Sequence, residues 1–371
     1  MNRISESDLQ YMKRALRLAE KACGSTSPNP MVGAVMVKNG KIIAEDYHRK
    51  AGEPHAEALV IAKAGRAARG ASLYVTLEPC CHTDKRTPPC SRSIIEAGLK
   101  KVFIAMKDPN PKVSGRGIQE LKEHGISVLE GILEDKAQRL NEAYRKYVLT
   151  RRPFVTLKAA MTLDGKIATP EGRSKWITGE KARRIVHKMR CCSDAVMTAI
   201  GTVRLDNPEL TSRIGCKKQP LRIVIDPELA TPLDYKVCTV PPETIFVVNE
   251  LADKAKIAKL QARGIRFLIH SGQRADMDWL MIRLGEMAIT SVLVEGGSSF
   301  NATCLMQNVV DKAVFFISPK IICGKTSIPV VGGNAFLKLE DAVRLTDVQM
   351  RKIDDDIMIS GYVRQLPQIK V

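Results

Sequence analysis

Hydrophobic and polar residues in the first part of the chain alternate between a helical and a strand-like spacing. Apolar residues over residues 7–22 share one helix face, and Ser5 or Ser7 can cap its start. Short apolar runs predict strands, and Asn39-Gly40 between two of them predicts a hairpin turn. Alternating helices and strands favour an α/β sheet with helices packed on it. The expected strands cover residues 32–37, 41–46, 72–77, 101–106 and 126–129, and the expected helices cover residues 7–22, 55–64, 90–97 and 118–124.

The hydrophobic pattern changes near residue 150. A connecting helix is expected over residues 136–148, after which Arg151-Arg152-Pro153 interrupts the pattern and a new strand begins at residues 154–158. A chain of 371 residues is long for one domain. We therefore expect two domains, at residues 1–149 and 150–371. Further strands are expected near residues 194–199, 221–225, 244–248, 291–295 and 312–317, with helices between them.

The composition narrows the class of protein. Lys and Arg number 58 against 40 Asp and Glu, a formal net charge of +18, which suits nucleic acid or phosphorylated small substrates. The charge is spread along the sequence and only 5% of residues are aromatic, so few side chains could stack on bases. Nucleic acid is therefore not expected as a general partner. No apolar run is long enough to span a membrane and the first residues form no secretory signal, so we expect a cytoplasmic protein without membrane contact.

The ten cysteines are distributed over the whole chain. A disulfide scaffold is normally short and secreted. We therefore expect most of these cysteines to be reduced and buried, with a cluster available for metal.

The strongest chemical signature is His55 and Glu57, followed by Pro79-Cys80 and Pro89-Cys90. One imidazole and two thiolates can bind zinc and leave a fourth position for water, whose pKa zinc lowers. Glu57 can pass protons between that water and a leaving amine. The pattern H-x-E…P-C…C is typical of zinc deaminases of nucleobases and related rings, whereas a lone histidine would more often belong to a core.

The neighbours of these residues leave some alternatives open. We expect His55 and Glu57 at the start of one helix and the cysteines at the start of the next, where a helix N-terminus stabilises a thiolate. Cys81 points away from Cys80 in an extended segment, so a structural role is predicted for it. His82 could bind metal, but a place in a substrate loop is favoured.

Three segments of the first half resemble the deaminase of riboflavin biosynthesis. Residues 78–90 resemble its E-P-C-x-H-x-G-[RK]-T-P-P-C segment, with Asp84-Lys85 in place of one glycine, and residues 27–35 and 108–117 resemble two further loops. The resemblance implies a cytidine-deaminase-like, three-layer α/β/α domain. It also implies a phosphorylated diaminopyrimidinone substrate, in contact with Asn29, His82, Arg86 and Thr87.

The second half has weaker chemical signals. It lacks the G-x-G-x-x-G fingerprint of a dinucleotide-binding Rossmann unit. Glu295-Gly296-Gly297-Ser298 follows an apolar strand and opens a helix, where backbone amides can bind phosphate. Trp176 is one of only two tryptophans, and core packing explains it equally well.

Five segments of the second half resemble the reductase domain of the same family: residues 156–168, 174–178, 201–211, 294–298 and 318–324. The resemblance covers both halves nearly end to end, in the family's domain order. It implies a dihydrofolate-reductase-like α/β fold and NADPH as cofactor, with Lys158 orienting the reacting sugar. It places NADPH near Ala160, Trp176, Thr202, Asp206 and Gly297, and the ribosyl phosphate near Ser174, Arg190, Leu210, Arg213 and Glu295.

A bifunctional riboflavin-biosynthesis enzyme is therefore expected. Zinc-dependent hydrolysis would deaminate 2,5-diamino-6-ribosylamino-4(3H)-pyrimidinone 5′-phosphate, and NADPH-dependent reduction of the side chain would give 5-amino-6-ribitylamino-uracil 5′-phosphate. One alternative is a tRNA or DNA deaminase with an accessory domain, which the charge favours and the aromatic content opposes. Another is a zinc-stabilised binding protein, which Glu57 opposes because a structural zinc needs no proton shuttle. The sequence leaves open whether the protein is a homo-oligomer.

Overall fold

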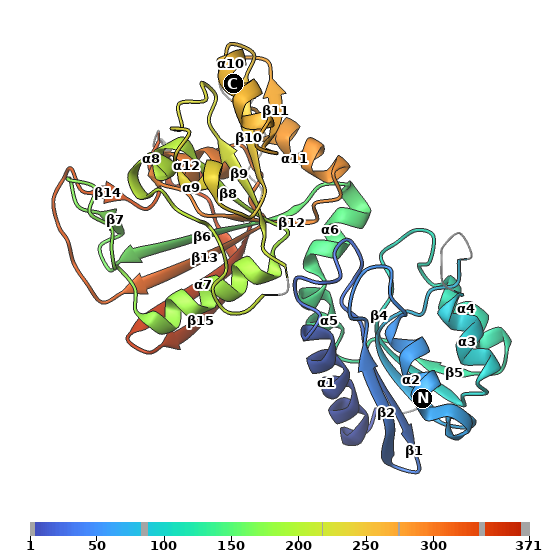
Figure 1. Ribbon diagram of the computed structural model, residues 1–371. Helices are drawn as coiled ribbons and strands as arrows, with labels where there is room; N and C mark the ends of the chain where they lie inside the picture. Colours follow the sequence, from blue (N-terminus) through green and yellow to red (C-terminus); the bar gives the residue numbers. More distant parts are fainter. Residues whose placement is uncertain (1–3, 83–87, 217, 274, 334–337, 365–371) are drawn as a thin grey trace. The chain divides into compact units, whose positions relative to one another are not determined.

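The computed structural model describes residues 4–82, 88–216, 218–273, 275–333 and 338–364. Arg86 and Thr87, two predicted substrate residues, lie outside these ranges. The chain forms two compact units, Met1–Arg151 and Arg152–Val371 (Figure 1). Within the described ranges, no helix is both long and apolar enough to cross a membrane.

The first unit is built on a mixed five-stranded sheet in the order β2-β1-β3-β4-β5. Asn39 and Gly40 both have positive φ angles, as the predicted turn between β1 and β2 requires. The sheet is antiparallel from β2 to β3 and parallel from β3 to β5. Its strands are β1 (Gly33–Lys38), β2 (Lys41–Tyr47), β3 (Ser72–Leu77), β4 (Lys101–Met106) and β5 (Ser127–Leu129).

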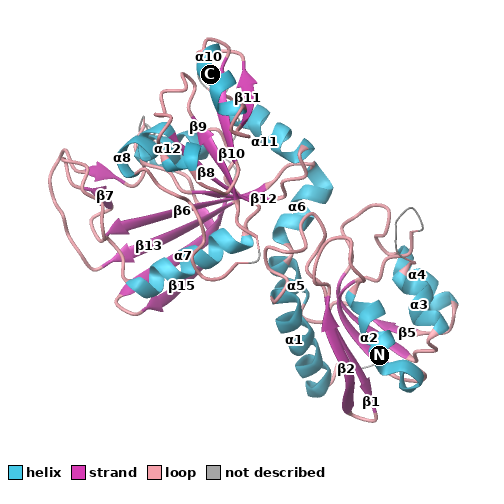
Figure 2. Ribbon diagram, in the orientation of Figure 1, coloured by secondary structure: helices cyan, strands magenta, loops and turns pink. Residues whose placement is uncertain are grey.

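Helices cover both faces of this sheet, which confirms the predicted three-layer α/β/α arrangement (Figure 2). Ser5 caps α1 together with Asp8 in a capping box. Gly33 allows α1 to approach β1 closely, because a Cβ there would lie 2.1 Å from the backbone oxygen of Ala15. On one side lie α1 (Glu6–Glu20) and α5 (Glu134–Leu140), and on the other lie α2 (Ala56–Ala64), α3 (Cys90–Glu96) and α4 (Arg116–Glu123).

The helix predicted over residues 136–148 is in fact two helices, α5 and α6 (Glu142–Thr150). The break is at Asn141, whose side chain bonds both backbone groups of Met31: Oδ1 accepts from the N–H at 2.8 Å and Nδ2 donates to the carbonyl at 3.0 Å. A partner 110 residues away in sequence therefore interrupts a helix that local pattern would continue.

The second unit contains a nine-stranded sheet in the order β11-β10-β9-β8-β12-β6-β13-β16-β15. The strands from β11 to β13 are parallel, and the C-terminal hairpin β15–β16 adds to them in antiparallel fashion. The strands are β6 (Phe154–Thr162), β8 (Ala195–Ala199), β9 (Leu221–Ile225), β10 (Thr244–Asn249), β11 (Arg266–His270), β12 (Ser291–Val294), β13 (Lys312–Ser318), β15 (Leu345–Ile353) and β16 (Asp356–Val363). A separate short ladder joins β7 (Lys166–Ala168) to β14 (Ile328–Pro329).

Two hydrophobic cores lie on opposite faces of the nine-stranded sheet. Alternate residues of β8 separate them: Val196 packs with Leu210 and Leu293, whereas Met197 packs in the core that contains Leu280. The helix α7 (Glu180–Cys192) covers the Val196 face, and α11 (Met277–Glu286) and α12 (Ser298–Met306) cover the other. The remaining helices of the unit are α8 (Ile200–Asp206), α9 (Lys236–Thr239) and α10 (Lys254–Gln261).

The cysteines differ in part from the expectation that most are reduced. Cys191 and Cys216 form a disulfide that links the end of α7 to the segment before β9. Six others among the described residues are not joined in a disulfide: Cys80, Cys81, Cys90, Cys238, Cys304 and Cys323, of which Cys81 is half-buried and Cys323 is exposed.

Candidate functional site

The first unit gathers three metal-ligating side chains: His55, Cys80 and Cys90. The Nδ1 atom of His55 lies 3.6 Å from the sulfur of Cys80 and 3.3 Å from that of Cys90. A nitrogen and a sulfur bound to one tetrahedral zinc ion lie about 3.6 Å apart, given the usual zinc–sulfur and zinc–nitrogen bond lengths, which is close to both distances. The donor set and its spacing therefore fit zinc.

Local structure explains how these donors meet. His55 is the N-cap residue of α2, Cys80 follows β3 after two residues, and Cys90 is the first residue of α3. The expectation that both cysteines begin a helix was wrong for Cys80, because Pro79 leads it out of the strand as a loop. The backbone N–H of Cys90 points to the sulfur of Cys80 at 3.5 Å, which favours a thiolate there.

Glu57 is buried beside this cluster, with 3% of its surface exposed. Burial raises the pKa of its carboxyl, and the neighbouring His55 opposes that shift. Within the described part of the chain, its Oε2 atom has no hydrogen-bond partner. A buried carboxylate oxygen without a partner is costly, so the position is suited to a ligand that binds beside the metal donors.

Asn29 and His48 lie next to the same cluster. The Asn29 Nδ2 atom is 3.2 Å from His48 Nε2, and His48 Nδ1 is 3.2 Å from the carbonyl of Pro54. The imidazoles of His48 and His55 meet edge to face, with centroids 5.2 Å apart. Burial lowers the pKa of His48, which favours a neutral ring. Of the other predicted substrate residues, His82 is half-buried two residues after Cys80.

Glu78 is a functional candidate that the sequence motifs did not single out. Its carboxylate accepts hydrogen bonds from four backbone N–H groups, those of Asp108, Gly115, Gly117 and Ile118, at 3.0–3.3 Å. Gly117 must lack a Cβ, because one would lie 2.1 Å from the carbonyl oxygen of Pro79. Glu78 thus binds the loop after β4 to the turn that presents Cys80. The Asp-Pro-Asn-Pro and Gly-Arg-Gly segments were recognised in the sequence. It was not predicted that backbone N–H groups of both segments donate hydrogen bonds to the Glu78 carboxylate.

The second unit contains a buried ion cluster at the ends of its strands. Glu295 directly follows β12, and its carboxylate meets Lys158 of β6 at 3.2 Å and Arg190 of α7 at 2.5 and 3.1 Å. Burial alone would raise the pKa of Glu295, but Lys158 and Arg190 lower it to about 2. Ligands commonly bind outside the carboxyl ends of parallel strands. The structure thus places three of the predicted reductase residues, Lys158, Arg190 and Glu295, in contact at such a position.

Two predicted cofactor residues also meet. A Cβ at Gly297 would lie 3.6 Å from the hydroxyl oxygen of Thr202, so the start of α12 lies against α8. Asp206 is one helical turn after Thr202 on the same face of α8. Ala160 lies on β6 two residues after Lys158 and is half-buried beside the core under α7. These residues line the same strand ends as the ion cluster.

Trp176 belongs to the surface, which excludes the core-packing explanation. Its side chain is 63% exposed, and the guanidinium of Arg183 lies 4.6 Å from its ring centroid. The Lys320 ammonium donates hydrogen bonds to the carbonyl oxygens of Trp176 and Ile177, at 2.8 and 2.9 Å. Ser174 is half-buried in the same segment between β7 and α7.

Leu210 and Arg213 lie on the segment between α8 and β9. Leu210 is 3% exposed and packs in the core, so its backbone is the part that a ligand could reach. Arg213 is exposed and its guanidinium lies 3.6 Å from the Glu209 carboxylate. The Arg190 guanidinium donates to the carbonyl of Thr211 at 2.9 Å. The ion cluster is thereby connected to this segment.

Comparisons with known proteins agree with both sites. The family model described as "RibD C-terminal domain" matches residues 153–359, and the one described as "Cytidine and deoxycytidylate deaminase zinc-binding region" matches residues 5–106. Riboflavin biosynthesis protein RibD of Actinobacillus pleuropneumoniae is 44% identical over 360 residues, 96% of each chain. Its namesake of Aquifex aeolicus is 43% identical over 358 residues, 96% of this chain and 98% of the other.

Solved structures cover the chain equally well. Acinetobacter baumannii RibD superposes with a TM-score of 0.86 at 35% identity, covering 97% of this chain and 99% of that one. The Thermotoga maritima protein titled as a diaminohydroxyphosphoribosylaminopyrimidine deaminase and 5-amino-6-(5-phosphoribosylamino)uracil reductase gives a TM-score of 0.85 at 38% identity, covering 96% and 98%. The predicted fold class, a deaminase-like α/β/α domain followed by an α/β reductase domain, is confirmed. With two matching domains in the same order and relatives above 40% identity over nearly the whole chain, the protein belongs to the RibD family of riboflavin biosynthesis proteins.

Proposed function

We propose that this protein is a bifunctional enzyme of riboflavin biosynthesis, with a deaminase in residues 1–149 and a reductase in residues 150–371. The deaminase acts on 2,5-diamino-6-ribosylamino-4(3H)-pyrimidinone 5′-phosphate, and the reductase converts the ribosyl side chain of the deaminated product to ribityl. Zinc and NADPH are the cofactors. We place the protein in the cytoplasm.

In the first reaction, water adds to the ring carbon that carries the amine, the carbon–nitrogen bond breaks, and ammonia leaves. His55, Cys80 and Cys90 would hold a zinc ion, which would lower the pKa of a bound water and make hydroxide available near neutral pH. Glu57 Oε2 receives the proton that the water loses and returns it to the departing amine. Asn29 binds the pyrimidine ring, with its amide oriented by His48. His82, Arg86 and Thr87 complete the substrate contacts.

In the second reaction, hydride adds to C1′ of the sugar, the C1′–O4′ bond opens, and O4′ takes a proton. NADPH supplies the hydride when it is bound near Ala160, Trp176, Thr202, Asp206 and Gly297. Lys158 orients the sugar, and Glu295 fixes the Lys158 ammonium through their 3.2 Å contact. The phosphate of the substrate binds near Ser174, Arg190, Leu210 and Arg213, where a guanidinium suits it.

One observation carries the deaminase proposal: Glu57 Oε2 has no partner among the described residues although it is buried beside three metal donors. A purely structural zinc site needs no such carboxylate. For the reductase, the corresponding support is the meeting of Lys158, Arg190 and Glu295 at the strand ends.

The purified protein tests both activities in one experiment. With the diamino substrate and no NADPH, ammonia should be released and the deaminated ribosyl compound should accumulate. Addition of NADPH should then consume that compound, with loss of the NADPH absorbance band in equal amount. Ammonia release from tRNA but not from the pyrimidine would favour the nucleic-acid deaminase instead, and zinc binding without ammonia release would favour a binding protein.

A further inference from the structure

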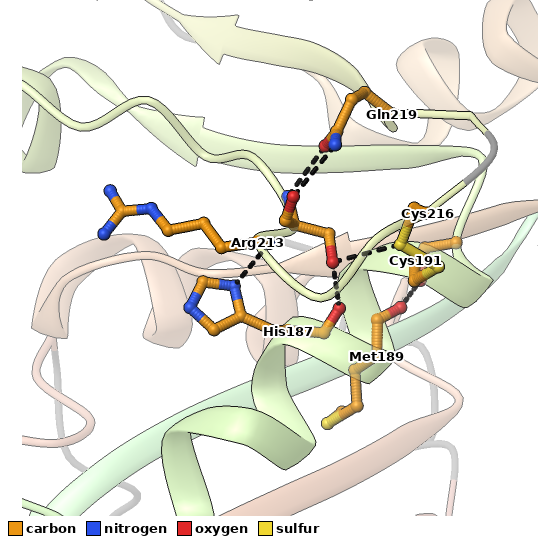
Figure 3. The surroundings of a disulfide bond; sticks show 8 residues. His187, Met189, Cys191, Arg213, Cys216 and Gln219 are labelled. Atoms are coloured by element: carbon orange, nitrogen blue, oxygen red, sulfur yellow. Dashed lines mark hydrogen bonds between the residues drawn. A yellow bond between two sulfur atoms is a disulfide. The ribbon is translucent and has the colours of Figure 1, made fainter. Parts of the chain in front are cut away.

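His187 connects α7 to the segment that carries Arg213. It lies one helical turn before Arg190, so the two side chains occupy neighbouring positions on α7. Its Nδ1 atom accepts a hydrogen bond from the backbone N–H of Arg213 at 3.3 Å, and its carbonyl accepts one from the Ser212 hydroxyl at 2.8 Å (Figure 3). A single residue of α7 thus holds two consecutive residues of the segment.

We propose that His187 is a further residue of the reductase's phosphate subsite: its Nδ1 positions the backbone of Arg213, and its Nε2–H donates a hydrogen bond to the phosphate of the substrate. The inference rests on the proposed function, which assigns that phosphate to Arg190 and Arg213. Because Nδ1 accepts a hydrogen bond, the proton of a neutral imidazole lies on Nε2 and makes it a donor. In Figure 3 the imidazole and the Arg213 side chain extend in the same direction, so both can reach one anion.

The charges around His187 favour an anion over a cation. Three charged groups act on the ring: Arg190 from α7, Arg213 from the segment after α8, and Glu295 after β12. Burial and the two guanidinium groups lower the pKa of His187, and they outweigh a hydrogen bond with the backbone of Thr211 and the Glu295 carboxylate, which both oppose the shift. The Glu295 carboxylate is already shared between Lys158 and Arg190. A phosphate bound here would balance the excess positive charge and would raise the pKa of the imidazole.

Further contacts order the segment that carries Arg213. The main chain of Ser212 exchanges two hydrogen bonds with the Gln219 side chain, at 2.7 and 2.9 Å. The Cys191–Cys216 disulfide links the same segment to the end of α7, with 5.7 Å between the two Cα atoms. Order that exists before binding lowers the entropic cost of binding. The loss of His187 should therefore be felt in substrate affinity.

Substitutions can separate the two roles of the ring. His187→Asn keeps an acceptor near the position of Nδ1 and removes the Nε2 donor. His187→Gln places an amide donor near the position of Nε2 and removes the Nδ1 acceptor, and His187→Ala removes both. Lys188→Gln is the matched control, because Lys188 is an exposed neighbour on α7 and its loss removes one positive charge.

The readouts are KM and kcat for the deaminated substrate, and inhibition by ribose 5-phosphate as a phosphate probe. For His187→Ala we expect KM and the inhibition constant to rise about tenfold or more, the effect of losing a hydrogen bond to a charged group, with kcat changed much less. In the His187→Asn and His187→Gln variants, KM and the inhibition constant should each rise less than in His187→Ala. Lys188→Gln should behave as wild type. KM and inhibition constants for His187→Ala within twofold of wild type, or a fall in kcat alone, would overturn the proposal.

A measurement on the unmodified protein guards against variants that fold poorly. Nuclear magnetic resonance can follow the titration of the His187 imidazole with and without ribose 5-phosphate, in saturating NADP⁺ to fill the cofactor site. We expect the pKa of His187 to rise when the probe binds, and an unchanged pKa would contradict the phosphate contact. If wild type does not oxidise NADPH with the deaminated substrate, the proposed function fails, while this titration still tests His187.

Discussion

The two candidate sites use charge in opposite ways. In the first unit, three metal donors lie together beside a buried Glu57 oxygen that has no hydrogen-bond partner among the described residues. In the second unit, the Glu295 carboxylate is already paired with Lys158 and Arg190. The first site therefore needs a metal from solution to be complete, whereas the carboxylate of the second is neutralised by the chain itself before any ligand binds. Metal should control one activity and leave the stability of the other unit unchanged.

The largest effect should come from removal of a metal donor. Cys90→Ser should lose zinc and with it all ammonia release, because the oxygen of serine is a poor replacement for a thiolate at zinc. Cys81→Ser is the matched control, since Cys81 lies outside the cluster that His55, Cys80 and Cys90 form. Metal analysis and ammonia assays on both proteins check this. Zinc retained by the Cys90 variant and lost by the Cys81 variant would reverse the assignment.

A smaller effect is expected from a substitution that slows deamination without removing a zinc ligand. Glu57→Gln should keep zinc but slow deamination by roughly 10²- to 10⁴-fold, the scale of general acid–base catalysis. The reductase should still oxidise NADPH with the deaminated substrate. Glu53→Gln, at an exposed position in the loop before α2, serves as control. Near-normal ammonia release from the Glu57 variant would exclude this carboxylate as the proton carrier.

The two sites also differ in how far the sequence alone predicts them. His55, Cys80 and Cys90 lie within 35 residues, at the ends of short elements that hydrophobic spacing already indicates. Lys158 and Glu295 are 137 residues apart, and no local pattern connects them. Their assignment depended on resemblance. Glu78 was part of a recognised motif but received no role, and His187 was missed, because the partners of both are backbone groups, which carry no residue-specific signal.

The secondary structure was likewise predicted where local sequence determines it and missed where partners remote in sequence do. Buried strands such as β3, β4 and β9 were predicted almost to the residue, because both of their faces are buried and most of their residues are apolar. The hairpin of β15 and β16 was missed, since the middle of β15 is exposed and polar and its place at the sheet edge is fixed by β16 alone. The helix break at Asn141 was missed because its cause, the backbone of Met31, is remote in sequence.

The contribution of the Glu295 ion cluster can be tested through the free energy of unfolding of the second unit. The pKa of Glu295 is lowered to about 2 from 4.5, so its ionised form stabilises the folded state by about 3 kcal/mol. That contribution is complete above the unfolded value and is lost as pH falls through 4.5 toward 2. Glu295→Gln should therefore lower the free energy of unfolding at neutral pH and differ less from wild type at about pH 3.

Tryptophan fluorescence gives this measurement for the second unit alone, because both tryptophans, Trp176 and Trp279, belong to it. Glu286→Gln is the control, since its exposed pair with Arg283 should be worth less than about 0.5 kcal/mol. Equal urea midpoints for the Glu295 and Glu286 variants at neutral pH would show that the buried cluster does not hold the unit together. Removal of zinc should leave the wild-type midpoint unchanged.

An effect of similar size is expected from the disulfide, which links the segment that carries Arg213 covalently to the end of α7. Cys191 and Cys216 are 25 residues apart, and closing a loop of that size stabilises a fold by about 2–4 kcal/mol. Cys216→Ser should lower the free energy of unfolding, measured from tryptophan-detected urea curves, by that amount at most, because the contacts of His187 with Ser212 and Arg213 remain. Cys323→Ser, at an exposed free thiol, should change stability by less than about 0.5 kcal/mol. Treatment of wild type with dithiothreitol should reproduce the Cys216 variant. If both midpoints stay at the wild-type value, the segment owes its order to hydrogen bonds and ion pairs, and the second site needs no covalent link to remain assembled.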